Sequence, residues 1–166
     1  MASAARLQRP GRHPEVTDRY ATIFFVAGSA CIVAGGLVAA ATTPLGLVDG
    51  SWSAAYLVLV CGVAQCLFGV VRSELAPAPL TPAGFSIEFS CWNLGNAAVI
   101  AGTLINAPLV VDSGGALLIV VLLMQISHLR YARPGLRWAL WLYGLVIAIL
   151  LLSIPIGLML AAITAK

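Results

Sequence analysis

The sequence predicts an all-α, polytopic membrane protein, a bundle of five transmembrane helices with its N-terminus inside the cell and its C-terminus outside. Three observations lead to this fold class. The 166 residues are 61% hydrophobic and only 9% charged, whereas soluble domains average roughly 45–50% apolar and about 25% charged residues. The apolar residues form blocks long enough to cross a bilayer, which takes ~20 residues. The arginines also gather on one side of the resulting topology.

Five apolar blocks are the expected membrane spans, and residues that favour turns separate them. The spans cover residues 21–42, 53–71, 85–109, 116–131 and 138–163. The breaks contain Pro44, Gly46, Asp49 and Gly50, then the proline-rich segment Arg72–Gly84, then Asp112–Gly115, and finally Arg133–Gly135. The fourth block has the fewest clean apolar residues, which leaves a re-entrant or interfacial segment as the alternative to a full span.

The distribution of charge sets the orientation. With five spans, eight arginines lie on one side, and the loop residues Asp49 and Asp112 lie on the other. The arginines are Arg6, Arg9, Arg12, Arg19, Arg72, Arg130, Arg133 and Arg137. The positive-inside rule assigns their side to the cytoplasm, so we expect a multi-pass protein of the cell (plasma) membrane. Without a full fourth span the last three arginines would move outside, so the rule favours that span.

Residues 1–19 are small, polar and basic, and we expect them to form a flexible cytoplasmic tail before a single transmembrane domain over residues 20–166. The apolar run of the first span is longer than the 7–15 residues of a cleavable signal core, so this helix should remain uncleaved. Aromatic rings favour the membrane boundaries. The expected boundary residues are Tyr20, Tyr131, Trp138, Trp141 and Tyr143 on the inner side, and Trp52 and Tyr56 on the outer side.

Small residues at four-residue spacing predict close contacts between helices. The first span carries two such ladders, Ala27-Cys31-Gly35-Ala39 and Gly28-Ile32-Gly36-Ala40, and the third span carries the pairs Cys91-Gly95 and Ala98-Gly102. The spacing leaves open whether these contacts form within one chain or between subunits. The four cysteines lie inside apolar spans without a CxxC motif, so we interpret them as structural.

A polar stripe along the third span is the main candidate site. Its residues recur at helical spacing, with Val99 filling the gap: Glu88, Trp92, Asn96, Thr103 and Asn106. Polar groups inside a span usually face the protein interior or a water-filled path. The stripe therefore either lines a permeation or ligand path or fixes helix packing through hydrogen bonds. Supporting polar residues at matching depth are Gln65, Asn93, Gln125 and His128.

His128 has three possible roles: a proton-linked gate with Glu88, a haem or metal ligand, or an interfacial residue beside Arg130. Bis-histidine haem within one chain is excluded, because the other histidine, His13, lies in the tail. The sequence contains no hydrolase triad, phosphate loop or zinc spacing, so we expect no enzymatic activity, metal or cofactor. A net charge of +3 with scattered basic residues argues against binding of nucleic acid.

Two short segments resemble the acetate uptake (succinate–acetate permease) transporter family. The second span reads Gly62-Val63-Ala64-Gln65, and the third contains Phe89-Ser90-Cys91-Trp92. The resemblance implies path-lining roles for Gln65 and Trp92, a hexamer, and small monocarboxylates as solutes. Two family features differ in this chain: the N-P-x-P-L-G-L signature is absent from the tail, and a sixth span is missing. Residues Thr43–Leu47 echo the signature, but after the first span.

Two functional hypotheses follow from the bundle and its stripe. The first is a transporter or channel subunit for a small solute, with the third helix lining the path. The alternative is a non-catalytic accessory or assembly subunit of a larger membrane complex, with the stripe as its docking face. Both hypotheses imply a protein that works in the lipid bilayer, either as a homo-oligomer or as part of a membrane complex.

Overall fold

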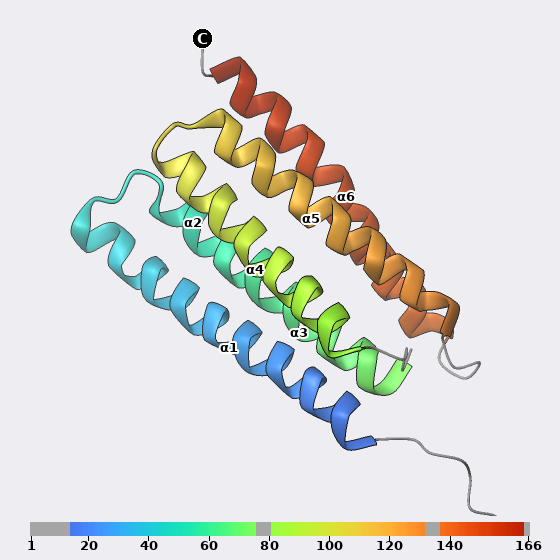
Figure 1. Ribbon diagram of the computed structural model, residues 1–166. Helices are drawn as coiled ribbons and strands as arrows, with labels where there is room; N and C mark the ends of the chain where they lie inside the picture. The colour runs from blue at the N-terminus through green and yellow to red at the C-terminus, as the bar shows by residue number, and fades with distance from the viewer. Residues whose placement is uncertain (1–13, 76–80, 132–136, 165–166) are drawn as a thin grey trace, which may run out of the picture.

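The computed structural model describes residues 14–75, 81–131 and 137–164, which form helices joined by short turns and contain no strand within these ranges. The elements in order are α1 (Pro14–Leu45), α2 (Gly50–Tyr56), the π-helical η1 (Leu57–Val63), α3 (Ala64–Val70), the π-helical η2 (Val71–Leu75), α4 (Pro82–Leu104), α5 (Pro108–His128), the 3-10 turn η3 (Leu129–Tyr131) and α6 (Arg137–Thr164). The run from α2 to η2 is one continuous helix, which we call rod 2. The described chain is therefore a bundle of five helical rods, as Figure 1 shows.

Three of these helices are long and apolar enough to cross a membrane, over residues Arg19–Leu45, Gly50–Glu74 and Pro108–His128. Helix α4, with 23 residues, lies among them in the bundle. The prediction of an all-α membrane bundle is confirmed. Successive rods run in opposite directions (Figure 1), so Arg19, Arg72 and Arg130 lie toward one end of the bundle. Which end faces the cytoplasm stays a prediction.

The expected boundary between the third and fourth spans is wrong. Residues Asp112–Gly115 are helical, and α5 begins at Pro108 rather than near residue 116. The turn lies earlier, at Ile105–Ala107, where Asn106 adopts a φ of 52°. Asparagine tolerates this left-handed conformation better than most residues, and proline suits the first position of the next helix. The fourth block is thus a full-length helix of 21 residues.

Other boundaries also differ from the expected ones. Helix α1 runs through Pro44 to Leu45, α2 begins at Gly50, and α4 begins at Pro82. Residues 14–19, placed in the flexible tail, belong to α1, which starts at Pro14, a residue that suits the first helical position. Rod 2 continues past residue 71 to Leu75, so Arg72 is helical instead of the start of a loop. Residues 1–13, the break at Arg133–Gly135 and Lys166 lie outside the described residues.

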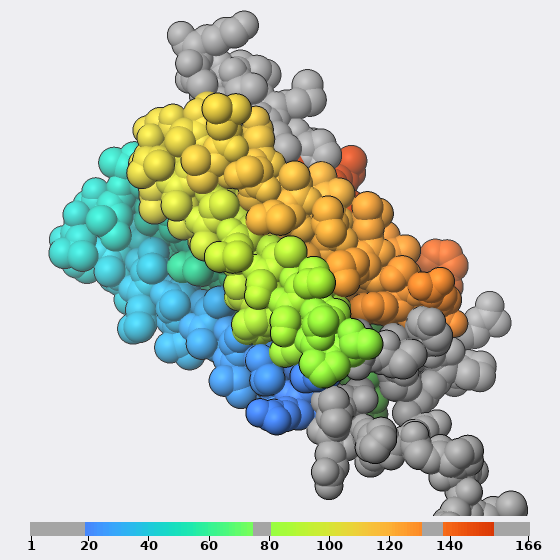
Figure 2. All heavy atoms as spheres, viewed as in Figure 1, coloured from blue at the N-terminus to red at the C-terminus, as the bar shows by residue number. Residues whose placement is uncertain are grey.

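The rods pack as two glycine-lined pairs, α1 with rod 2 and α4 with α5, while α6 packs on α5. On the face drawn in Figure 2, α4 (yellow-green) lies between α1 (blue) and α5 (orange). A Cβ added to Gly28 would lie 2.7 Å from the carbonyl oxygen of Gly62 in rod 2. A Cβ on Gly114 of α5 would lie 2.7 Å from the carbonyl oxygen of Gly95 in α4. Backbones this close leave room only for glycine. Both contacts join helices of the same chain.

The glycines of the two small-residue ladders of the first span differ in their surroundings, although not ladder by ladder. Gly28 and Gly35 both face rod 2, whereas a Cβ on Gly36 would meet no atom within 4 Å. Gly95 and Gly102 of the third span both face α5, as their spacing predicts. The small residues therefore set the approach of neighbouring helices, except for Gly36, which borders open space.

Candidate functional site

The centre of the candidate site is an ion pair between rod 2 and α4. The Arg72 Nη2 atom lies 2.7 Å from both carboxylate oxygens of Glu88. The side chains are 3% and 0% exposed, although both come from sequence positions near helix ends. Arg72 belongs to the π-helical turn η2, and π-helical turns occur frequently at functional sites. The expected place of Arg72, in a cytoplasmic loop, is therefore wrong.

Two more helices reach this pair through side chains. The Gln125 amide on α5 donates a hydrogen bond to Oε1 of Glu88. The Tyr143 hydroxyl on α6 donates to Oε1 of Gln125 at 3.1 Å. Gln125 and Tyr143 are only 2% and 3% exposed. One chain of contacts thus joins rod 2, α4, α5 and α6.

His128 lies beside the ion pair and not only at the surface. Its Nδ1 atom is 3.4 Å from Nη2 of Arg72, and the residue is half-buried at the end of α5. Because a guanidinium only donates hydrogen bonds, this contact requires an unprotonated Nδ1. Among the residues that the structure describes, no three His, Cys, Asp or Glu side chains converge to hold a metal ion.

Aromatic rings surround the charged pair and keep its environment apolar. The Arg72 guanidinium carbon lies 5.7 Å from the ring centre of Phe24, close enough for a cation–π interaction. Phe24 packs edge-on against Phe68 and Phe85, and Phe68 packs against Trp92 with ring centres 4.6 Å apart. In such surroundings each charge depends on its partner, because water cannot solvate it.

Buried polar groups continue from the ion pair along both facing helices. Rod 2 places Gln65, Phe68 and Arg72 on one face, at steps of three and four residues. Helix α4 places Glu88, Trp92 and Asn96 on one face, at two steps of four residues. Several of their polar atoms are buried without a hydrogen-bond partner among the described residues. These atoms are Gln65 Nε2 and Oε1, Arg72 Nε and Nη1, Trp92 Nε1 and Asn96 Oδ1. We call Gln65, Arg72, Glu88, Trp92 and Asn96, together with Gln125 and Tyr143, the polar interior.

Three of the five residues of the predicted stripe belong to the polar interior, and two do not. Glu88, Trp92 and Asn96 are buried, but Thr103 is half-buried and its hydroxyl donates to the Val99 carbonyl of its own helix. Asn106 is exposed in the turn after α4. The idea of a stripe across the whole bilayer is therefore wrong, because the helix ends at Leu104 before the last position is reached.

Some of the supporting polar residues also lie in or beside the polar interior, and one does not. Gln65 and Gln125 are buried in the polar interior, and His128 touches its ion pair. Asn93 is half-buried and donates to the Phe89 carbonyl of its own helix at 2.8 Å. Of these four residues, Gln125 bonds to Glu88 and His128 lies beside Arg72, whereas Asn93 bonds to its own helix.

Two residues of the site were not identified from the sequence. From the sequence, we interpreted Arg72 only as one of the arginines that mark the cytoplasmic side. Arg72 lies seven residues after Gln65, however, and therefore on the same helix face. Tyr143 was expected at the inner boundary with Trp138 and Trp141. Those two tryptophans are 70% and 78% exposed, whereas Tyr143 is buried one turn before Ile147. The position of Tyr143 on the face that carries Ile147 was the available signal.

The hydrogen bond of Tyr143 gives a first testable prediction. We expect Tyr143→Phe to lower the free energy of unfolding by about 0.5–1.5 kcal/mol, because it removes one buried hydrogen bond and little packing. Thermal unfolding in detergent would measure the loss. In a double-mutant cycle, adding Gln125→Leu should cost less in the Tyr143→Phe protein than in the wild type. Fully additive losses would contradict a direct bond.

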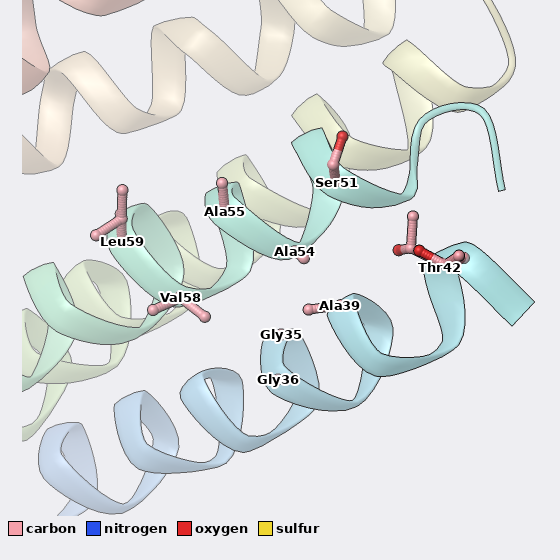
Figure 3. Close-up of a pocket in the computed structure, with 10 residues that line it drawn as sticks. Gly35, Gly36, Ala39, Thr42, Ser51, Ala54, Ala55, Val58 and Leu59 are labelled. Atoms are coloured by element: carbon pink, nitrogen blue, oxygen red, sulfur yellow. The ribbon is translucent and has the colours of Figure 1, made fainter.

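A surface groove of about 470 Å³ lies away from these residues, between α1 and the first half of rod 2. Figure 3 shows the residues that line it, among them Gly35, Gly36 and Ala39 on α1 and Ala54, Ala55 and Val58 on rod 2. None of the predicted site residues lines it. The groove is therefore a separate feature of the surface, bordered by the small residues of the first span.

The resemblance to the acetate uptake family stays a prediction based on its two short motifs. Their residues Gln65 and Trp92 are both buried in the polar interior. Neither the two motifs nor the burial of these residues identifies a solute. No family model, curated protein or solved structure matches this chain.

Proposed function

We propose that the chain is a transporter or channel subunit that moves a small solute along the face between rod 2 and α4. The observation that carries this proposal is the fully buried Arg72–Glu88 pair with unpartnered polar atoms beside it. Ionisable residues inside a membrane domain are expensive, and they usually mark pathways for substrates or ions. A purely structural contact needs no such row of unpartnered groups, because buried polar atoms are normally paired.

The accessory-subunit hypothesis has less support from the same residues. A docking face has to be exposed, and Glu88, Trp92 and Asn96 are all buried inside this chain. The polar interior therefore supports a path more than an interface.

The proposal includes the plasma membrane as location and a cytoplasmic N-terminus. Support for the orientation comes from Arg19, Arg72 and Arg130, which lie toward one end of the bundle, opposite the turns that follow α1 and α4. The positive-inside rule then favours the arginine end as cytoplasmic. A homo-oligomer remains part of the proposal, since five helices enclose little volume.

A matched pair of variants on α4 tests the proposal. We expect Asn96→Leu to reduce solute uptake about tenfold or more, because it replaces a buried polar group of the path with an apolar one. Asn93→Leu makes the same change one turn away, outside the polar interior, and should leave uptake near the wild-type rate. Uptake of labelled urea, guanidinium, nitrate and acetate into proteoliposomes, relative to protein-free vesicles, is the measurement. Equal uptake by both variants would contradict the path.

A further inference from the structure

The buried charges of the bundle balance one another. Arg72 and Glu88 are the buried charged side chains among the described residues, and one carries a positive and the other a negative charge. The remaining charged groups nearby, Glu74 and Arg130, are exposed. The polar interior is therefore close to electroneutral while the pair is intact.

The unpartnered atoms of the polar interior include both donors and acceptors. The donors are Arg72 Nε and Nη1, Trp92 Nε1 and Gln65 Nε2, and the acceptors are Gln65 Oε1 and Asn96 Oδ1. All four residues are at least nine-tenths buried. An anion such as nitrate offers only acceptors and a cation such as guanidinium offers only donors, so either would leave part of this set without a partner.

We propose that the polar interior takes small electroneutral solutes that carry both N–H donors and oxygen acceptors, of the amide or urea class, and discriminates against monovalent ions of similar size. This inference rests on the proposed function. An ion entering the site would leave one charge in excess, far from water, and an uncompensated buried charge is strongly unfavourable. A neutral solute with both kinds of group can bond to the unpartnered atoms without disturbing the pair.

Three solutes of the same shape test the proposed preference for electroneutral solutes over ions, which we call the charge rule. Urea, guanidinium and nitrate are planar and three-armed, and they are neutral, positive and negative respectively. We expect the wild-type protein in liposomes to take up labelled urea at least about tenfold faster than guanidinium or nitrate, after subtraction of protein-free vesicles. The factor follows from the penalty on an uncompensated charge.

Charge variants add a signature that size selection alone would not produce. Glu88→Gln leaves Arg72 in excess, so the ratio of nitrate to urea uptake should rise about tenfold or more. Arg72→Gln leaves Glu88 in excess, so the ratio of guanidinium to urea uptake should rise instead. Glu74→Gln removes an exposed carboxylate outside the polar interior and should leave both ratios unchanged.

The outcomes separate this inference from the function on which it rests. Nitrate or guanidinium entering the wild-type protein as fast as urea would overturn the charge rule and leave a path in place. Uptake of acetate alone would overturn the preference for electroneutral solutes and leave a path in place, whereas uptake of all three solutes and of acetate at the rate of protein-free vesicles would contradict both proposals. The wild-type ranking decides these cases even where a charge variant does not fold.

Discussion

Replacing Glu88 with alanine should cause the largest loss of stability of any single substitution in the polar interior. The substitution leaves the Arg72 guanidinium buried without its carboxylate and removes the acceptor of the Gln125 amide. Breaking a buried ion pair by removing one partner typically costs about 3–5 kcal/mol. We expect a loss of that size, with the apparent Tm in detergent as the measurement.

Two companion variants show whether the loss comes from the unpaired charge. Glu74→Ala removes an exposed carboxylate and should stay within about 0.5 kcal/mol of the wild type. The double variant Arg72→Met, Glu88→Met replaces both charges with apolar groups and should recover most of the lost stability. A double variant as unstable as Glu88→Ala would refute the role of the unpaired guanidinium.

The second large effect is expected at Gly28, where α1 and rod 2 are closest. In Gly28→Val, the new Cβ would meet the Gly62 carbonyl oxygen at 2.7 Å and the Cys66 backbone nitrogen at 2.9 Å. Neither atom belongs to a flexible side chain, so the helices must move apart. Overpacking typically costs about 1–3 kcal/mol, occasionally more, and we expect a loss at the upper end.

Gly36 supplies the matched control for this variant, on the same helix. A Cβ at Gly36 would meet nothing within 4 Å, and valine is a better helix former than glycine. Gly36→Val should therefore leave the Tm unchanged or raise it slightly. Thermal unfolding of both proteins in the same detergent is the measurement, and equal losses at the two positions would contradict the packing argument.

The fold class and the number of helical rods could be predicted because they depend on hydropathy, which acts over whole segments. The boundary after the third span could not, because the same residue types serve two purposes. Asp112–Gly115 looked like a turn, yet Gly114 is there to let α4 approach. Asn106 supplies the actual turn through its backbone conformation. A glycine in the sequence alone does not show whether the chain turns there or whether another helix packs closely against it.

The site was predictable where polar residues lie inside the expected spans, on one face of the third span and at matching depth at Gln65 and Gln125. Glu88, Trp92 and Asn96 share a face of α4, so spacing alone brought them together. Arg72 and Tyr143 come from other helices, and their places depend on how those helices rotate in the bundle. Counting Arg72 as an inside charge supported the topology but concealed its role, because a residue near the end of a span can satisfy the positive-inside rule and still be buried.

The contrast between glycine contacts and aromatic contacts has a consequence for motion. Backbones touch within the α1–rod 2 pair and within the α4–α5 pair, whereas α1 meets α4 through the rings of Tyr20, Phe24, Phe85 and Phe89. Side-chain rings can slide and change rotamers without breaking backbone packing, as in shear motions between packed helices. If helices move in this bundle, we therefore expect the movement to fall between the two pairs and not within them. The Arg72–Glu88 ion pair joins rod 2 to α4 across this boundary, so it would have to open or shift with such a movement.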